Sequence, residues 1–169
     1  MGYKISKVDI GEYTYRDDLY SLILKKYSPL VRGKVLDVGA GPTAWAKKMF
    51  GKSLEVITFD QSGEVDVHGD LLAAPFPDNS FDCIFCFETI EHVKDPFKAV
   101  SEMRRMLKPG GMLVASTPFI HELHGEDYGD YWRITRQAWA LLLRDFKDVE
   151  ITHFGKEMSP HHYLVKGIK

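Results

Sequence analysis

The sequence has 169 residues, of which 44% are hydrophobic, 12% aromatic and 27% charged, and its formal net charge is −2. These values are typical of a globular protein and argue against a disordered or fibrous chain. A nearly neutral chain gives no electrostatic reason to bind nucleic acid or an anionic membrane, and no apolar run reaches the ~18 residues of a membrane span, so we expect one cytoplasmic domain, residues 1–169.

Helical and strand-like patterns alternate along the chain, which indicates an α/β fold with a mainly parallel sheet. Four helices are predicted, at residues 19–27, 42–50, 97–107 and 135–143. Seven strands are predicted, at residues 35–38, 54–60, 66–69, 81–87, 112–116, 149–154 and 163–167. The last two strands follow the last helix and are joined by a polar turn. We therefore predict a Rossmann-like three-layer sandwich with a seven-stranded, mostly parallel sheet and a C-terminal antiparallel hairpin.

Two local features refine this prediction. The link between the second and third predicted strands, residues 61–65, is too short for a full crossover helix. Cys83 and Cys86 have the spacing of a redox or zinc pair, but they lie in a predicted strand, where positions 83 and 86 face opposite sides. We therefore interpret both as buried core thiols.

A glycine loop follows the first predicted strand. Gly39-Ala40-Gly41 places bare backbone at the carboxyl end of that strand, where open α/β sheets bind ligands. Asp60 follows 19 residues after Gly41, at the end of the second strand, where a carboxylate can accept both hydroxyls of a ribose. Taken alone, this pattern also fits a plain tight turn or a nicotinamide site. Asp37 adds a carboxylate inside the strand, which needs loop amides or a cationic ligand group as partners.

A longer series of motifs carries a family resemblance. VLDVGAG, Asp60, the segment HGDLLAAPFPDNSFDCIFCFETIEHVKDP and RRMLKPGGMLVASTP occur in this order. In order and spacing they resemble class I S-adenosylmethionine-dependent methyltransferases, strongly over residues 35–118 and more loosely to the end of the chain. One departure is Thr43, where family members commonly carry a third glycine; with Pro42 before it, a stiffer loop is implied.

The resemblance implies S-adenosylmethionine as the cofactor and assigns residues to it. Asp37, Gly39, Ala40 and Gly41 match the motif that receives the methionine part. Asp60 matches the ribose-binding acid, and Gln61 lies beside the adenosine. Asp70 and Leu71 match the pair that reads adenine, and Phe87 matches the position beside the sulfonium and methyl.

The candidate catalytic residues follow the fourth and fifth predicted strands. Glu88, Glu91 and His92 follow the fourth, and His121 and His124 follow the fifth. Histidine has the side-chain pKa best suited to removing a proton near neutral pH, so His92 and then His121 are the predicted bases. A cap or ion pair at a helix start is the alternative for Glu91 and His92.

Two segments are candidates for covering the site. Residues 119–134 form a polar, aromatic loop that is expected to contact the acceptor through His124, Tyr131 and Arg133. Glu88, which follows the fourth predicted strand, is expected to contact the acceptor as well. Packing of the loop is the alternative role for Tyr131 and Arg133. His121, His124 and Asp127 lack a recognised metal spacing, and we assign no metal site. Residues 1–30 form an N-terminal helical segment and possible lid that carries Tyr3, Tyr13, Tyr15 and Tyr20. His161 and His162 are expected at a strand edge.

We therefore predict a methyltransferase that uses S-adenosylmethionine and a small-molecule acceptor, with oxygen, nitrogen or carbon as the acceptor atom. The Asn/Asp-Pro-Pro-Tyr/Phe signature of amino-group methyltransferases is missing where Phe87-Glu88-Thr89-Ile90 stands. A non-catalytic cofactor-binding partner subunit of the same fold is the first alternative, and a nicotinamide-dependent oxidoreductase is the second. Acceptor identity and oligomeric state are not encoded in any motif that we identify.

Overall fold

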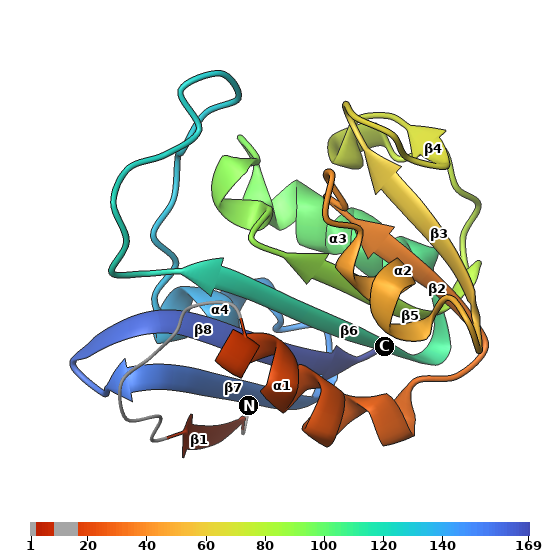
Figure 1. Cartoon of the computed structure of the whole chain (residues 1–169). Helices are drawn as coiled ribbons and strands as arrows, with labels where there is room; N and C mark the ends of the chain where they lie inside the picture. Colours follow the sequence, from red (N-terminus) through yellow and green to blue (C-terminus); the bar gives the residue numbers. More distant parts are fainter. Residues whose placement is uncertain (1–2, 9–16) are drawn as a thin grey trace.

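The computed structural model describes residues 3–8 and 17–169, and one eight-stranded sheet forms its centre (Figure 1). The strand order is β1-β7-β8-β6-β5-β2-β3-β4, and β8 alone among these strands runs antiparallel to its neighbours. The strands are β1 (Lys4–Val8), β2 (Lys34–Val38), β3 (Glu55–Asp60), β4 (Val67–His68), β5 (Phe81–Phe87), β6 (Leu107–Pro118), β7 (Lys147–Lys156) and β8 (Ser159–Ile168).

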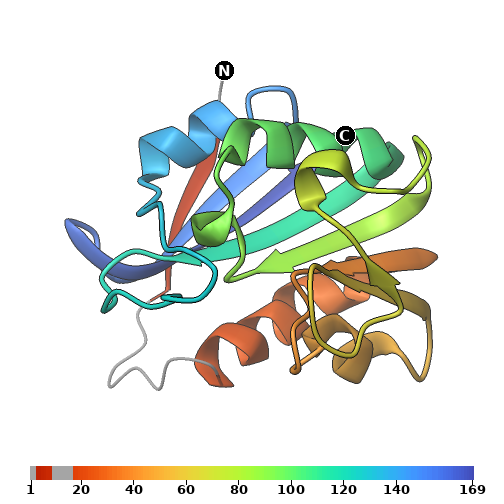
Figure 2. The same ribbon diagram turned by 90° about the horizontal axis from the view of Figure 1, so that it is seen from above.

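Helices cover both faces of the sheet, which gives three layers. Helices α1 and α2 lie on one face, and α3 and α4 lie on the other (Figure 2). The helices are α1 (Asp17–Tyr27), α2 (Trp45–Phe50), α3 (Pro96–Met106) and α4 (Arg136–Leu142), with short 3-10 turns η1 (Ser28–Leu30), η2 (Leu71–Ala73) and η3 (Ile90–His92). Each face has its own buried apolar cluster. None of the helices in the described ranges has the length and apolarity needed to cross a membrane.

The predicted Rossmann-like sandwich is confirmed, and all seven predicted strands are present. The antiparallel hairpin is β7 and β8. An eighth strand, β1, lies beside β7 at the edge of the sheet and was not predicted, because the polar start of the chain shows no clear alternation. The short link between β3 and β4 carries no helix although the two strands pair in parallel, as predicted.

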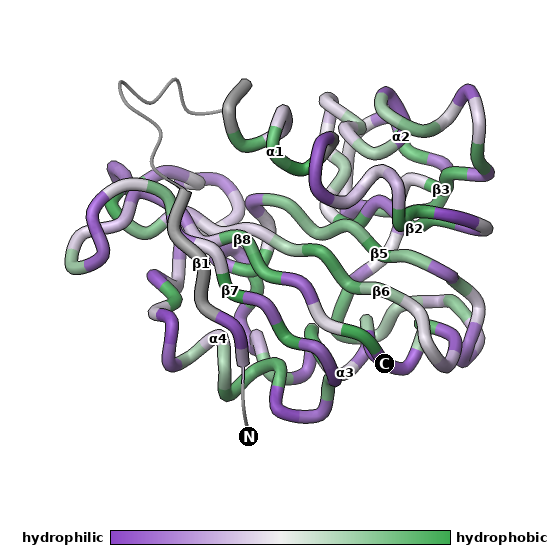
Figure 3. The backbone as a smooth tube through the Cα atoms, turned by 90° about the horizontal axis from the view of Figure 1, so that it is seen from below, coloured by the Kyte–Doolittle hydropathy of each residue, from purple (hydrophilic) through white to green (hydrophobic). Residues whose placement is uncertain are grey.

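The central strand β5 shows why its burial could be predicted from the sequence. Its residues are buried on both faces except for Asp82, and the tube coloured by hydropathy is green along most of the strand (Figure 3). Cys83 belongs to the apolar cluster under α1 and α2, whereas Cys86 belongs to the cluster under α3 and α4. Both thiols are free, and burial raises their pKa, so the prediction of two core thiols on opposite faces is confirmed.

The helix after the glycine loop is shorter than predicted. We expected Pro42 to occupy the first helical position, but α2 begins at Trp45. Gly41 (φ +49°) and Ala44 (φ +42°) are left-handed, so the residues between them form a turn that the Ala44 N–H closes onto the Ala40 carbonyl at 2.8 Å. The predicted end is confirmed, because the Gly51 N–H closes the last turn.

Asp37 anchors α2 to the sheet. This β2 carboxylate is only 3% exposed, and its Oδ2 accepts a hydrogen bond from the Ala46 N–H at 2.9 Å. We predicted loop amides or a cationic ligand group as partners of Asp37, and the structure shows a backbone amide in the first turn of α2 instead of one in the loop. Burial raises its pKa to about 6, although the amides of Ala46 and Lys47 oppose this rise by stabilising the charged form.

A pH dependence of stability follows from Asp37. Because its pKa is higher in the folded chain (about 6) than the ordinary aspartate value of 3.8, its contribution to stability is fully present below pH 3.8 and is lost as the pH rises through 6. Urea unfolding of the wild type and of Asp37→Asn at pH 4 and pH 7 measures this contribution. We expect the wild type to lose up to about 3 kcal/mol relative to the variant between these pH values. An equal pH dependence in both proteins would contradict the assignment.

Candidate active site

A pocket of about 470 Å³ lies where β2, β3 and β5 end. Its walls come from the turn after β2, from the last residues of β3 and the turn that follows, and from the segment between β5 and η3. Parallel strands bring their carboxyl ends to one edge, which is where ligands bind in open α/β sheets. The pocket therefore lies where the motifs predicted it.

Eight of the nine residues assigned to the cofactor line this pocket: Asp37, Gly39, Ala40, Gly41, Asp60, Gln61, Leu71 and Phe87. The ninth, Asp70, is exposed and is absent from the lining, although Gly69 and Leu71 on either side belong to it. Its carboxylate instead caps η2 by accepting the Leu72 N–H at 2.9 Å. One oxygen of Asp70 is thus already engaged by the backbone.

Gly39 and Gly41 are required for different steric reasons. At Gly39 (φ +66°) a Cβ would lie 2.0 Å from Thr89 Oγ1, so a side chain is excluded by packing. At Gly41 (φ +49°) a Cβ would have no neighbour within 4 Å. Gly39 therefore lets the loop approach the end of β5, whereas Gly41 leaves open space on the pocket side.

Asp60 fastens the loop from the end of β3. Its Oδ2 accepts the Gly41 N–H at 2.9 Å, and its Oδ1 accepts the Gln61 N–H at 2.6 Å and the Ser62 N–H at 3.3 Å. The Gly39 N–H also reaches β3, donating to the Phe59 carbonyl at 2.9 Å. The acid predicted to bind a ribose thus also sets the position of the loop.

Aromatic rings form the wall of the pocket next to α1. Tyr20 stacks on Trp45 with 3.6 Å between ring centroids, and it meets Phe87 edge-on at 6.0 Å. All three rings line the pocket. Of the other tyrosines of the predicted lid, Tyr3 packs against the apolar cluster on the opposite face, and Tyr13 and Tyr15 lie outside the described residues.

His92 lies in the pocket wall at the end of η3, with Tyr128 of the following loop as a neighbour at 4.7 Å between rings. Its Nδ1 contacts the Gly129 carbonyl, which can only accept, so this nitrogen carries the proton and Nε2 carries the lone pair. Burial lowers its pKa, which keeps the ring neutral near pH 7.

Glu91 is fully buried beside His92. Neither carboxylate oxygen has a hydrogen-bond partner in another described residue, so the alternative of a helix cap is not supported. Its Oε1 lies 3.8 Å from His92 Nε2. Burial, together with the charge of Glu88, raises the pKa of Glu91 well above its usual range.

Glu88 lies in the pocket wall after β5, in a left-handed conformation (φ +50°). Ser116 Oγ lies 2.6 Å from Glu88 Oε1, and His162 Nε2 lies 3.1 Å from Oε2. We expected His162 at a strand edge, but β8 pairs on both sides and His162 is only 1% exposed. That expectation is wrong, because the C-terminal hairpin inserts β8 between β7 and β6.

The loop 119–134 reaches the pocket through a residue that we did not predict, Tyr128. His121, His124, Tyr131 and Arg133 are absent from the lining. His121 is exposed, with its ring 5.0 Å from that of His124. Arg133 binds both oxygens of Asp130, which holds the pKa of Asp130 well below its usual range. This ion pair connects two residues within the loop 119–134.

The sequence reasoning overlooked the residues that support the site from other elements. Trp45, Tyr128 and Ser116 belong to no pattern that marks ligand contact. His162 was visible only as one of a histidine pair. Their roles depend on pairings such as β6 with β8, which place Ser116 opposite Leu164 and Pro118 opposite His162.

Comparison with known proteins supports the same fold and identifies the family. Residues 36–115 match a family model described as a methyltransferase domain. A ubiquinone/menaquinone biosynthesis C-methyltransferase of Pasteurella multocida is 33% identical over 190 aligned positions, covering 92% of this chain and 70% of that protein. A demethylmenaquinone methyltransferase of Renibacterium salmoninarum is 36% identical over 104 positions, covering 54% of this chain and 44% of that protein. The chain thus spans less than half of the Renibacterium relative.

Solved structures agree at the level of the fold. A SAM-dependent methyltransferase of Archaeoglobus fulgidus superposes with a TM-score of 0.70 at 19% identity, over 90% of this chain and 94% of that one. One from Aquifex aeolicus gives 0.62 at 22% identity, over 88% of each chain. With the family model and the Pasteurella relative, these likenesses confirm the resemblance, and this chain belongs to the class I methyltransferases, whose cofactor is S-adenosylmethionine.

Proposed function

We propose that this chain transfers a methyl group from S-adenosylmethionine to a small organic acceptor. The observation that carries the proposal is that a single pocket is lined both by the glycine loop with Asp60 and by His92 with Tyr128. The first pair forms the cofactor end and the second forms the acceptor end. Phe87 and Glu88 lie between them along the chain and line the same pocket.

The residues at the cofactor end fit S-adenosylmethionine. The volume of about 470 Å³ lies within the usual range of ligand sites. The open space at Gly41 admits a ligand close to the backbone, and Asp37 and Asp60 supply carboxylates suited to an ammonium group and to ribose hydroxyls. Leu71 and Phe87 add apolar surface. Asp70 and the exposed Gln61 are proposed to contact the adenosine, in the case of Asp70 through its remaining oxygen.

Methyl transfer requires mainly that the acceptor be oriented toward the methyl group of the cofactor. When bound, S-adenosylmethionine supplies an electrophilic methyl group on a sulfonium. The chain positions the acceptor for in-line attack and excludes water, to which Tyr128 of the loop 119–134 contributes by lining the pocket. His92 offers a neutral Nε2 whose lone pair can take a proton from the acceptor or bind a cation. Glu88 can contact a polar group of the acceptor. From the loop 119–134, His121 is proposed as a second base, and His124, Tyr131 and Arg133 are proposed to contact the acceptor.

We further propose a small aromatic acceptor, with a ring carbon as the first acceptor atom to test. The aromatic rings of Trp45, Phe87 and Tyr128 in the lining suit a planar ligand. The names of the Pasteurella and Renibacterium relatives place their substrates among quinone precursors, and a C-methyltransferase among them favours carbon. A cofactor-binding partner without catalysis remains the competing function, because the same pocket serves both.

Cofactor use is tested by calorimetry with S-adenosylmethionine and its demethylated product. We expect binding by the wild type and a loss of affinity of about 100-fold in Asp60→Ala, because this change removes the hydroxyl acceptor and frees the Gly41 N–H. Asp145→Ala, an exposed acid beyond α4, serves as the control and should bind like the wild type. Absence of heat and of any thermal shift with either compound would contradict the proposal.

His92→Gln separates binding from catalysis. The variant should bind the demethylated cofactor like the wild type and lose at least about 100-fold in turnover with an aromatic acceptor, because the Nε2 lone pair is removed. Turnover is followed as demethylated product formed over a panel of phenolic and quinol acceptors. His68→Gln, on exposed β4, is the matched control. Tight cofactor binding by the wild type with no turnover on any acceptor would favour the non-catalytic partner.

A further inference from the structure

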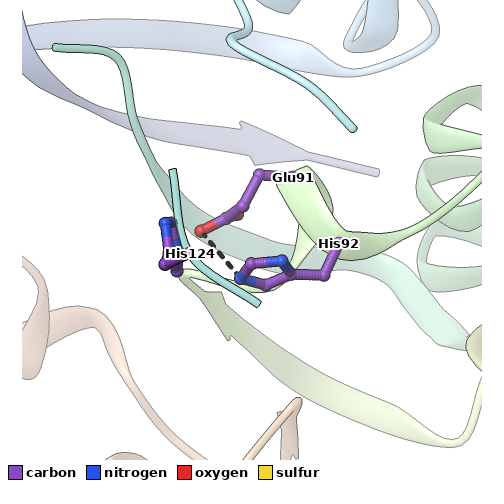
Figure 4. A group of neighbouring side chains, drawn as sticks. All are labelled: Glu91, His92 and His124. Carbon is purple, nitrogen blue, oxygen red and sulfur yellow. Dashed lines mark ion pairs between the residues drawn. The ribbon is translucent and has the colours of Figure 1, made fainter. Parts of the chain in front are cut away.

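Three side chains beyond the cofactor end converge on one point. Glu91 and His92 come from η3, and His124 comes from the loop 119–134, 32 positions further along the chain; all three point toward one another (Figure 4). One ligand atom from each lies within 4.8 Å of the others. The rings of His92 and His124 stand at 88° to each other with 4.8 Å between centroids.

Glu91 lacks a partner that its burial requires. The residue has 0% exposure, and neither oxygen is hydrogen-bonded to another described residue. Burying a carboxyl group without partners is costly, and native proteins rarely leave one so. Arg133 lies nearby but binds Asp130. The backbone N–H groups of Tyr131 and Trp132 donate to the backbone carbonyl of Glu91 and not to its carboxyl group. The carboxyl therefore faces a position that suits a cation.

Both histidines are held in the way that metal ligands usually are. His92 Nδ1 contacts the Gly129 carbonyl, and His124 Nδ1 lies 3.1 Å from the Glu122 carbonyl and 3.5 Å from Asp130 Oδ2. A histidine that donates one ring N–H to a carbonyl or carboxylate has its tautomer and orientation fixed for binding through the other nitrogen. Nε2 is thus the nitrogen left to bind a cation on each ring, and that of His92 lies 3.8 Å from Glu91 Oε1.

We propose that Glu91, His92 and His124 form a binding site for one divalent first-row transition-metal ion. Two imidazoles and one carboxylate suit zinc or iron rather than magnesium or calcium, which prefer oxygen ligands. Bonds of about 2.1 Å around a tetrahedral ion place ligand atoms about 3.4 Å apart. The ligand atoms of the three groups lie within 4.8 Å of one another, so the side chains must move closer together when the ion binds. This site departs from the sequence prediction, which assigned no metal, because Glu91 and His124 are brought together only by the fold.

The position of the site beside the pocket gives it two consequences. His92 lines the pocket, so an ion held by it would lie beside the acceptor end, where it could bind an acceptor oxygen. With the ion bound, His92 Nε2 is a ligand and no longer a proton acceptor. The ion also ties the loop 119–134 to η3. Metal binding itself does not depend on methyl transfer and is measured without cofactor or acceptor.

Equilibrium dialysis of the full chain against Zn²⁺, followed by metal analysis, tests the site. We expect one tightly bound ion in the wild type, a loss of affinity of at least about 100-fold in Glu91→Gln and in His124→Gln, and no loss in His68→Gln. Mg²⁺ should not compete. Zn²⁺ that stays bound in both ligand variants, or that is lost in His68→Gln instead, would show adventitious histidine binding and overturn the proposal, as would no binding to the wild type.

A second readout guards against a variant that fails to fold. Zn²⁺ should raise the thermal midpoint of the wild type and leave those of Glu91→Gln and His124→Gln unchanged, while circular dichroism checks that both variants are folded. Co²⁺ should give visible absorption bands with the wild type that both variants lack. Hydrogen exchange should slow in residues 119–134 on addition of Zn²⁺; an unchanged midpoint and exchange pattern in the wild type would count against the site.

Discussion

Two carboxylates fix the glycine loop, and the pocket depends on them. Asp37 accepts the Ala46 N–H from inside β2, and Asp60 accepts the Gly41 N–H from the end of β3. The parallel register that pairs Asp37 with Thr58 and Val38 with Phe59 brings these two acids to the same sheet edge. The two left-handed glycines of this loop then differ in role, because Gly39 packs against Thr89 whereas Gly41 leaves open space on the pocket side. The burial of Asp37, which raises its pKa to about 6, is the energetic cost of this arrangement.

The same sheet edge carries the second half of the site. Strand β5 ends at Phe87, and the chain then turns through Glu88 and Thr89 into η3, which presents Glu91 and His92. Thr89 packs so closely on Gly39 that a Cβ at position 39 would lie 2.0 Å from Thr89 Oγ1. Ser116 and His162 hold Glu88 from β6 and β8. The proposed cofactor end, acceptor end and metal site therefore lie side by side at this edge, and the loop 119–134 beside them carries the Arg133–Asp130 ion pair.

Much of this arrangement was predictable because it is local in sequence. Strand periodicity predicted seven strands, caps such as Asp95 and Thr135 marked helix starts, and the spacing from Gly41 predicted an acid, Asp60, at the end of β3. The failures came where distant segments decide the outcome. The late start of α2 depends on the left-handed turn at Gly41 and Ala44, and the burial of His162 depends on the insertion of β8 into the sheet. Likewise, nothing in the spacing of Glu91 and His124 foretells that they meet.

The most direct test of the account is a crystal structure of the chain with the demethylated cofactor bound. We predict that the compound lies in the pocket after β2, with its ribose on Asp60, its amino group toward Asp37 and the glycine loop, and its sulfur beside Phe87 facing His92. The empty methyl position should then open toward Tyr128 and the loop 119–134. A compound bound elsewhere, or one whose sulfur points away from His92, would contradict the division of the pocket into a cofactor end and an acceptor end.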